Sequence, residues 1–428
     1  FGRTTGGPAK VAVVSSGLMG SLSGSAVANT ATTGTFTIPM MRSAGFGRAT
    51  AGGLEAAASS GGALVPPVMG AGAYMMLEIV DPPVTYLEII RAALIPAILY
   101  YLAVFLIVDL SARRLRAGGQ GGVADDQVPQ LVPWQGVVFG GGLFALIGFL
   151  LAGTSVFRAV SLGMATVLVL SLLSAETRIT PARLLEAFRK ASAGGVALIS
   201  AAACVGVIIG VVTLTGIGGR LPALILPLAQ ESLVGALAVL MASSLVLGMG
   251  LPSVVCYLLL ATLVGPALGR LEVVPLAAHL FIFYFGLMSM VTPPVALAAY
   301  AASSIAGSDF WRTSLAAFRF ALVGFALPYM FVFRPELLML AGDGGAASPL
   351  EIAAAVALAL AGIVPLAAAI SGYLWRPLTP PWRLAMLVSA ALLLLPSAGE
   401  LRLTLWHLAG AAIPVAALLA GRRRSSGG

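Results

Sequence analysis

Two Pro-Pro-Val breaks inside apolar segments constrain this fold more than any other feature of the sequence. They stand at the same spacing behind an earlier proline, Pro66-Pro67-Val68 behind Pro39 and Pro293-Pro294-Val295 behind Pro266. A double proline removes backbone N–H donors and blocks helix continuation, so the freed carbonyls need other partners. Interrupted hydrophobic segments at corresponding places in two halves of a chain are typical of a transporter's binding site.

The composition assigns the chain to the polytopic membrane proteins. Hydrophobic residues make up 59% of the sequence and charged residues 9%, and the mean hydropathy is +1.02. Soluble domains carry about a quarter charged residues. A net charge of +8 would suggest nucleic-acid binding in a soluble protein, but here it favours basic anchors in cytoplasmic loops. Apolar runs that meet the requirement of roughly 20 residues for crossing a bilayer lie at 86–110, 194–217, 316–333 and 352–372.

The sequence shows no pattern that indicates an enzyme or a bound cofactor. Cys204 and Cys256 lie in apolar stretches and are interpreted as small hydrophobic residues. There is no CxxC pair, phosphate loop, nucleophile elbow or pair of catalytic carboxylates. Because the chain opens with Phe1 and not with Met, we expect it to be the C-terminal part of a longer protein.

The fold class that we predict is an all-α polytopic membrane protein with two re-entrant hairpins, each followed by a broken crossing. The hairpins are expected at about 10–41, turning at Ser23-Gly24-Ser25, and at about 232–269, turning at Leu251-Pro252-Ser253. The broken crossings are 50–80 and 275–305. Continuous crossings are predicted near 85–110, 134–151, 155–174, 193–217, 311–333, 350–372, 383–397 and 402–420.

The same pattern divides the chain into four parts. Residues 1–80 and 232–310 are the predicted halves of a transport domain, residues 81–231 are connecting or scaffold helices, and residues 311–428 are C-terminal helices with a basic tail. Three connecting segments complete the prediction, an interfacial arm at Arg220–Glu231 and flexible loops at Leu115–Gln130 and Gly342–Ala347.

The distribution of basic residues gives an orientation. If the first hairpin opens to the cytoplasm, most of the 24 Lys and Arg residues fall on the cytoplasmic side, as the positive-inside rule requires. The exceptions are Arg91, Arg158, Arg220, Arg270, Arg334 and Arg402. The second hairpin then opens to the opposite face, so the two copies form an inverted repeat, the architecture of alternating-access carriers.

The first hairpin carries the densest group of polar residues in the apolar part of the chain. Asn29 is the only asparagine in the sequence and is surrounded by Ser and Thr. Hard cations take ligands from hydroxyl, amide and backbone carbonyl oxygens, and helix N-termini favour anions. The alternative is that small hydroxyl residues only let helices pack closely. We favour that alternative for any single Ser or Thr, and an ion site for the cluster with Asn29. The second copy offers only Ser253, Thr262 and Thr292.

Glu55 is an acidic residue at expected membrane depth, which makes it a candidate functional group. It could be a coupling group or the partner of a helix end, and an ion pair with nearby Arg48 is equally compatible with the sequence. His279 and His407 are interpreted as hydrogen-bonded residues near the interface. The five tryptophans fall at predicted crossing ends and are interpreted as an aromatic belt: Trp134, Trp311, Trp375, Trp382 and Trp406.

Four motifs in order resemble signatures of the large membrane subunit of TRAP (tripartite ATP-independent periplasmic) transporters. They are Gly17-Leu-Met-Gly-Ser-Leu-Ser-Gly-Ser-Ala-Val-Ala-Asn-Thr-Ala-Thr-Thr-Gly34, Glu55-Ala-Ala-Ala-Ser-Ser-Gly-Gly62 with Pro66-Pro-Val-Met-Gly70, Gly248-Met-Gly-Leu-Pro252, and Thr292-Pro-Pro-Val-Ala-Leu-Ala-Ala-Tyr300. The helices after residue 350 resemble the fused subtype that works with a TAXI-type binding protein. The chain departs from the pattern by lacking a Gln after Gly61-Gly62 and by having Val254-Val255-Cys256 in the second hairpin.

The resemblance implies a sodium-coupled elevator permease in the bacterial inner membrane, which imports an organic acid delivered by a periplasmic binding protein. No cofactor is implied beyond Na⁺ as the coupling ion. The implied sodium ligands are Ser23, Ser25, Asn29, Gly61 and Gly62 in the first copy and Gly248, Gly250 and Thr292 in the second. The implied substrate contacts are Ser25, Thr32, Pro252, Ser253 and Thr262, and the helix breaks are Pro66, Pro67, Pro293 and Pro294.

Other function classes stay open at this point. A dicarboxylate symporter of similar inverted-hairpin design would need no binding protein. A passive channel can also be built from opposed half-helices, and would conduct without a coupling gradient. A membrane enzyme is the third class, and the lack of a converging acid, base, metal or nucleophile set argues against it.

Overall fold

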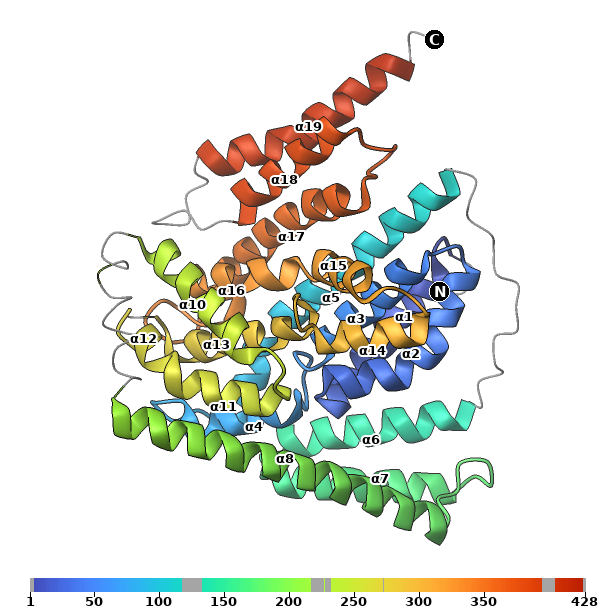
Figure 1. Cartoon of the computed structure of the whole chain (residues 1–428), viewed down its shortest axis with the longest axis vertical. Coiled ribbons are helices and arrows are strands. Elements are labelled where there is room, and N and C mark those ends of the chain that lie inside the picture. Colours follow the sequence, from blue (N-terminus) through green and yellow to red (C-terminus); the bar gives the residue numbers. More distant parts are fainter. Residues whose placement is uncertain are drawn as a thin grey trace. The chain divides into compact units, whose positions relative to one another are not determined.

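The computed structural model describes residues 4–117, 133–216, 227, 232–271, 273–394 and 405–425. Over these residues the chain is helical, without a β-strand (Figure 1). It forms two compact units, one made of residues 1–84, 89–124 and 209–428 and the other of residues 85–88 and 125–208. Most of the predicted arm at 220–231 and most of the predicted loop at 115–130 lie outside the described residues.

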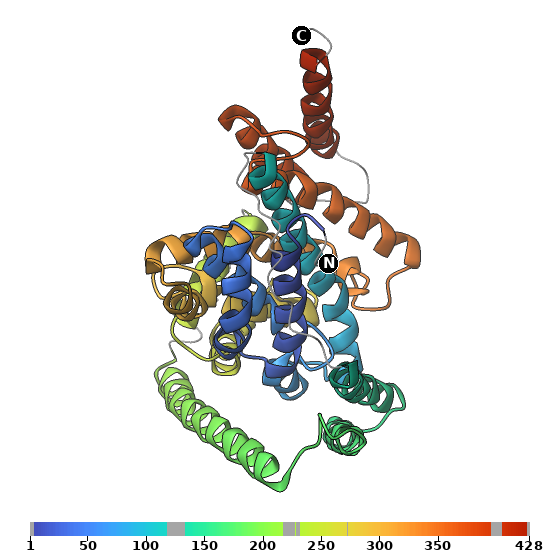
Figure 2. The same cartoon turned by 90° about the vertical axis from the view of Figure 1, so that its right-hand side faces the viewer.

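The first unit begins with a helical hairpin at the predicted position. Helices α1 (Gly7–Ser23) and α2 (Ala26–Ser43) pack side by side (Figure 2). The turn between them is the predicted one, because Gly24 adopts φ 62° and Ser25 caps α2 by accepting a hydrogen bond from the Ala28 N–H. Helix α3 (Arg48–Gly62) packs against both arms.

Both double prolines interrupt helices, as predicted. The first lies between α3 and α4 (Gly70–Ile79). The second lies between the pair α13 (Pro275–Met288) and η1 (Ser289–Val291) and helix α14 (Leu297–Ala306). Directly after each Pro-Pro-Val, one residue takes a left-handed conformation and the next helix starts: Met69 has φ 53° and Ala296 has φ 40°. The two copies therefore share the same backbone course at the break.

The second hairpin is formed by α10 (Leu233–Gly248) and α11 (Ser253–Leu263), followed by the short α12 (Gly265–Gly269). Its turn contains Gly250 at φ 80° and Pro252 directly before α11, in agreement with the predicted turn.

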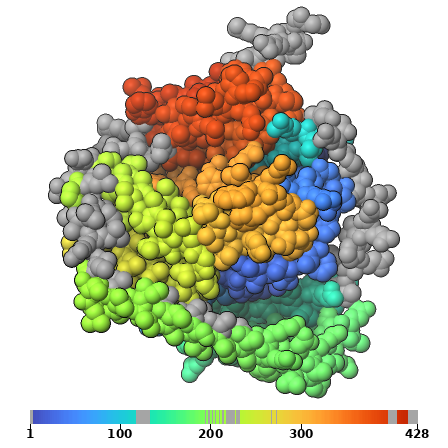
Figure 3. Space-filling view, in the orientation of Figure 1, coloured from blue at the N-terminus to red at the C-terminus, as the bar shows by residue number. Residues whose placement is uncertain are grey.

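The first unit also contains the following helical elements. They are most of α5 (Tyr86–Ala117), then α15 (Phe310–Phe320), α16 (Val323–Phe333), η2 (Pro335–Leu338), α17 (Pro349–Ser371), α18 (Pro380–Leu394) and α19 (Leu405–Ser425). The predicted crossing 311–333 is divided into α15 and α16 by a turn. Figure 3 shows α14 and α15 (orange) beside the N-terminal helices (blue), which agrees with the packing of both on α3.

The second unit contains α6 (Pro133–Leu151), α7 (Val156–Leu172) and most of α8 (Pro181–Thr215). The Trp134 indole donates to the Leu170 carbonyl at 3.1 Å and joins α6 to α7. Helix α8 starts well before the predicted crossing at 193–217. The Thr180 hydroxyl accepts from the Arg183 N–H at 3.3 Å, and Pro181 occupies the first turn, which is a helix start signal outside the apolar run.

Four helical segments among the described residues are long and apolar enough to cross a membrane: 86–116, 133–151, 310–333 and 349–371. Shorter apolar helices accompany them, including both arms of the second hairpin.

Candidate functional site

The tips of the two hairpins meet in the structure. The Ser253 hydroxyl at the start of α11 donates to the Gly24 carbonyl at 2.9 Å. The Gly24 backbone also lies against Gly70 at the start of α4, so close that a Cβ on Gly24 would come within 2.2 Å of the Gly70 Cα. Since α2 begins directly after this turn, the N-termini of α2, α4 and α11 converge at one place.

Asn29 lies in the interior of the first hairpin and is fully buried. Its side-chain N–H donates to the Ser16 carbonyl at 2.7 Å, while its amide oxygen has no partner among the described residues. Gly20 and Gly62 come together next to it: a Cβ on Gly20 would be 2.5 Å from the Gly62 Cα and 2.7 Å from the Asn29 side-chain nitrogen. The glycines are required here because any side chain would fill this space.

An unpaired amide oxygen at full burial costs free energy, on the order of 1–3 kcal/mol, unless something else binds it. The hydroxyls of Thr30 and Ser60 are also buried without a partner among the described residues. An amide oxygen and hydroxyls are the donor set that a hard cation takes. The residues present in the first hairpin and at the end of α3 therefore fit a hard monovalent cation by their chemistry.

Glu55 stands at the centre of a cage of hydroxyls from three helices. Ser16 on α1 donates to its carboxylate at 2.6 Å, and Thr33 and Thr37 on α2 donate at 2.5 Å each. Ser59, one turn further along α3, donates at 3.1 Å. The Ser16 carbonyl also accepts a hydrogen bond from the Asn29 side chain, and the Thr33 hydroxyl lies 2.8 Å from the Asn29 backbone carbonyl, so two residues of the cage also contact Asn29.

The sequence alone left the partner of Glu55 open, and the structure shows that its partners are hydroxyls. Arg48, the alternative ion-pair partner, instead donates to the Gly307 carbonyl at 3.3 Å. The signal that could have found the cage is the spacing of four residues between Thr33 and Thr37, which places both hydroxyls on one face of α2.

Several of the site residues implied by the resemblance have hydroxyls that form hydrogen bonds with nearby backbone atoms of their own segment. Thr32 donates to the carbonyl four residues earlier at 2.7 Å, Thr262 does so at 2.8 Å and Thr292 at 2.7 Å. Ser23 is exposed at the end of α1, and Ser25 accepts the capping hydrogen bond of α2. For Thr32, Thr262 and Thr292 the geometry matches the alternative in which hydroxyls bond the preceding turn.

The second hairpin repeats the arrangement around Asn29 with a thiol in place of the amide. Asn29 lies four residues after the cap of α2, and Cys256 lies four residues after the cap of α11. Cys256 is buried, and Cβ atoms on Gly248 and Gly286 would be 2.7 and 2.9 Å from its sulfur. A thiol is a poor ligand for a hard cation. The surroundings of Cys256 and Gly248, called the second centre from here on, therefore lack the amide oxygen of the first hairpin. There the Ser289 hydroxyl donates to the Gly248 carbonyl at 3.0 Å.

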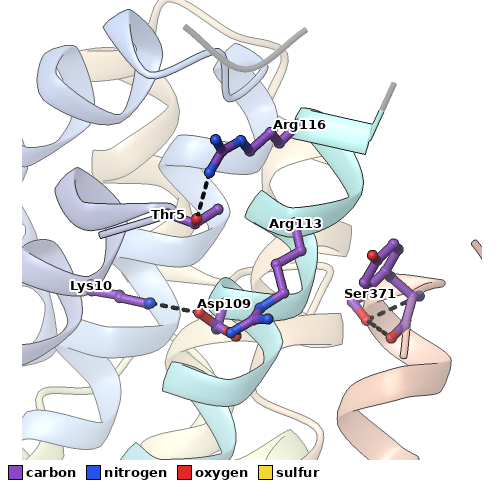
Figure 4. A network of polar contacts seen from close by, with 7 residues as sticks. Thr5, Lys10, Asp109, Arg113, Arg116 and Ser371 are labelled. Atoms are coloured by element: carbon purple, nitrogen blue, oxygen red, sulfur yellow. Dashed lines mark hydrogen bonds and ion pairs between the residues drawn. The ribbon is translucent and has the colours of Figure 1, made fainter. Parts of the chain in front are cut away.

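Polar contacts fasten α5 to the first hairpin (Figure 4). Lys10 of α1 pairs with Asp109 at 2.6 Å, and Arg113 pairs with the other oxygen of the same carboxylate at 2.7 Å. One turn further on, Arg116 donates to the Thr5 hydroxyl at 3.3 Å. These contacts connect the N-terminal part of the first hairpin to the C-terminal part of α5.

Two tyrosines fasten α5 to α3 as well. The Tyr100 hydroxyl donates to the Ala57 carbonyl at 2.8 Å and the Tyr101 hydroxyl to the Ala58 carbonyl at 2.5 Å. Tyr100 lies over Gly61, where a Cβ would come within 2.1 Å of its ring. This role was not predicted, since nothing in the sequence brings the apolar α5 to that face of α3.

Both histidines have polar neighbours, as expected from the sequence. His279 shares a hydrogen bond of 2.8 Å with the Tyr257 hydroxyl, and the His407 ring lies 3.5 Å from Arg334. Among the residues that the structure describes, no group of three His, Cys, Asp or Glu side chains could hold a metal ion.

Comparison with known proteins assigns the chain to a family. No curated protein matches it by sequence. The profile of the family described as "Tripartite ATP-independent periplasmic transporter, DctM component" matches residues 1–342, which include both hairpins and both broken helices. The chain belongs to this family and is an integral membrane component of a TRAP secondary transporter.

Proposed function

We propose that this protein is the permease of a sodium-coupled transporter that imports an organic acid by an elevator movement. The observation that carries the proposal is the buried, unpaired amide oxygen of Asn29 between two hairpin arms. Family membership supports secondary transport by a membrane component, and the proposal adds the coupling ion, the substrate class and the movement.

The proposed sodium site lies at Asn29. Its amide oxygen, the Ser60 hydroxyl and backbone carbonyls around Gly61 and Gly62 supply oxygen ligands without a formal charge, which suits a monovalent ion. The Glu55 carboxylate accepts hydrogen bonds from four hydroxyl donors, so we do not include it among these ligands. In the second centre Cys256 replaces the amide, so we expect weaker cation binding there.

The proposed substrate site lies where the N-termini of α2, α4 and α11 converge, at Gly24, Gly70 and Ser253. Each helix N-terminus carries about half a positive elementary charge and unpaired N–H groups. Three of them at one place favour a carboxylate, which supports an organic acid as the substrate class. Three of the substrate contacts implied by the resemblance lie at this convergence of helix N-termini: Ser25, Pro252 and Ser253.

In the proposed movement, the two re-entrant hairpins and the broken helices travel as one body across the membrane. The contacts of Lys10, Tyr100 and Tyr101 argue that α5 travels with that body. This extends the moving part beyond the transport-domain halves at 1–80 and 232–310, which remain a prediction from the sequence.

The proposed partner is a periplasmic binding protein of the TAXI type, and the proposed location is the bacterial inner membrane. Helices α17 to α19 follow the part of the chain that matches the family profile. We propose that they take the place of a separate small membrane subunit, as in the fused subtype.

The test is uptake of radiolabelled dicarboxylates and keto acids into proteoliposomes that contain the full-length protein. Uptake is measured with and without an inward sodium gradient, and with and without the binding protein encoded beside it. The proposal predicts uptake that requires both. Sodium-dependent uptake that is the same with and without the binding protein would instead indicate a simple symporter. Non-saturable flux without a sodium gradient would indicate a channel.

A further inference from the structure

Three arginines from three helices meet at the C-terminal end of α17. Arg114 of α5 donates to the Ser371 carbonyl at 3.0 Å, and Arg319 of α15 and Arg383 of α18 both donate to the Ile370 carbonyl at 3.3 Å. The guanidiniums of Arg114 and Arg383 also lie together over the helix end. A Cβ on Gly372 would be 2.6 Å from a terminal nitrogen of Arg114 and 3.3 Å from Nε of Arg383.

The charge of this cluster is not balanced by acidic side chains among the described residues. In the described part of the chain, the ion pairs are formed by Lys10, Arg113 and Lys190. None of the three clustered arginines takes part in one. The end of α17 supplies only about half a negative elementary charge. Three full positive charges therefore face half a negative one, and the excess attracts an anion.

A cavity of about 410 Å³ opens beside the cluster, which is within the range of roughly 300–1,000 Å³ typical of small-molecule sites. Two of the arginines line it together with hydroxyl groups and a set of apolar side chains. The two arginines are Arg114 and Arg319, and the hydroxyl groups are those of Thr50, Ser111 and Ser371.

We propose that this cavity binds the phosphate headgroup of an anionic phospholipid from the cytoplasmic leaflet. A guanidinium presents its N–H donors in a planar fork that matches phosphate oxygens. Basic pockets between membrane-spanning helices on the cytoplasmic side are suited to such headgroups.

The surroundings favour a lipid over a free phosphate. The cavity lies between the apolar segments 86–116, 310–333 and 349–371, and Phe46, Leu115 and Phe320 offer apolar surface for the part of a lipid next to its phosphate. The positive-inside count places Arg114, Arg319 and Arg383 on the cytoplasmic side. The site is separate from the proposed sodium and substrate sites and does not depend on them.

The test measures the dissociation constant of phosphatidylglycerol by native mass spectrometry of the full-length protein in mild detergent, with phosphatidylcholine as reference lipid. The variant carries Arg114→Gln and Arg319→Gln, which removes both charges and leaves shorter polar side chains that still carry N–H donors. At about 1 kcal/mol per basic residue near a charged lipid, the pair predicts a roughly thirtyfold weaker affinity for phosphatidylglycerol and no change for phosphatidylcholine.

The matched control is Arg113→Gln, which removes the neighbouring charge on α5. Arg113 is paired with Asp109 and is absent from the cavity lining, so its variant should bind phosphatidylglycerol like the unchanged protein. If Arg113→Gln weakened the affinity for phosphatidylglycerol as much as the double variant does, the effect would come from general surface charge, and the proposal would be overturned. Displacement of the lipid by millimolar inorganic phosphate or glycerol 3-phosphate would also overturn it, because the site would then take free phosphate.

Discussion

At the scale of residues, two buried polar groups, one in the first hairpin and one in the neighbouring helix α3, differ in their hydrogen bonding. Glu55 receives four hydroxyl hydrogen bonds, whereas the amide oxygen of Asn29 receives none among the described residues. Ser16 contacts both. A fully bonded carboxylate is suited to holding helices together, and an unbonded oxygen beside it is suited to taking a ligand.

Replacing Glu55 by glutamine should therefore destabilise the fold. The amide nitrogen would take the place of an acceptor oxygen and face a hydroxyl donor, at a cost on the order of 1–3 kcal/mol. Thermal unfolding in detergent should show a lower midpoint than for Glu78→Gln, a control on an exposed glutamate. Equal midpoints for the two variants would contradict the structural role of the cage.

Of these two buried groups, the sequence allowed the role of Asn29 to be predicted. Asn29 stands out because it is the only asparagine, and its place in a polar hairpin suggested a site. The spacing of Thr33 and Thr37 was one signal for the cage of Glu55, but the cage as a whole could not be predicted, because its donors come from α1, α2 and α3 and packing sets the rotation of each helix about its axis. Ser23, Thr32 and Thr292 matched a family signature. In the structure Ser23 is exposed, and the hydroxyls of Thr32 and Thr292 each donate to the backbone carbonyl four residues earlier.

At the scale of elements, glycines allow the hairpin tip to touch the broken helix. Gly24 and Gly70 both have positive φ, and their backbones are in direct contact. Nothing larger fits between α2 and α4, so the position of the turn also fixes where the N-termini of these helices converge.

Gly24→Ala should disrupt this convergence. The new methyl group would come within 2.2 Å of the Gly70 Cα in addition to straining a left-handed residue. Gly153→Ala is the matched control, because Gly153 has φ 78° and a Cβ added there would have nothing within 4 Å. The control should cost only the conformational strain of about 1–2 kcal/mol, with uptake preserved. Gly24→Ala should lower both the unfolding midpoint and uptake, and indistinguishable variants would refute the contact.

The turns and breaks were the elements that the sequence predicted best, because Gly-Ser, Leu-Pro-Ser and Pro-Pro act locally on the backbone. Helix boundaries away from such signals were less well predicted. Helix α8 begins at Pro181, a start that hydropathy does not reveal because the first turns are polar. The break between α15 and α16 was missed since no proline or glycine lies at Ala321-Leu322.

At the scale of the whole molecule, the proposed mechanism divides the chain into a moving body and a frame. Family membership covers residues 1–342, while the C-terminal helices from Pro349 onward lie beyond that match. The sequence predicted the membrane class and the internal repeat. It could not reveal that α5 is bonded to the first hairpin, because those contacts join segments far apart in the chain.

Two crosslinks test this division in a background with Cys204→Ser and Cys256→Ala. A short bifunctional linker between cysteines at positions 10 and 109 joins α1 to α5, where Lys10 and Asp109 pair at 2.6 Å. It should leave uptake unchanged, because both helices belong to the moving body. A linker between positions 114 and 371 joins α5 to α17, where Arg114 reaches Ser371, and it should stop uptake. The same outcome for both crosslinks would contradict an elevator with this boundary.

The most direct test of the central claim is equilibrium binding of radioactive sodium to the purified full-length protein, which requires no knowledge of the substrate. Asn29→Ala is compared with Thr35→Val, a control whose exposed hydroxyl bonds only within its own helix. We expect saturable binding in the unchanged protein and in Thr35→Val, and an affinity at least about tenfold weaker in Asn29→Ala, since loss of one ligand oxygen is worth on the order of 1.4 kcal/mol or more. Unchanged sodium affinity in a folded Asn29→Ala protein would contradict the claim that the buried amide of the first hairpin binds the coupling ion.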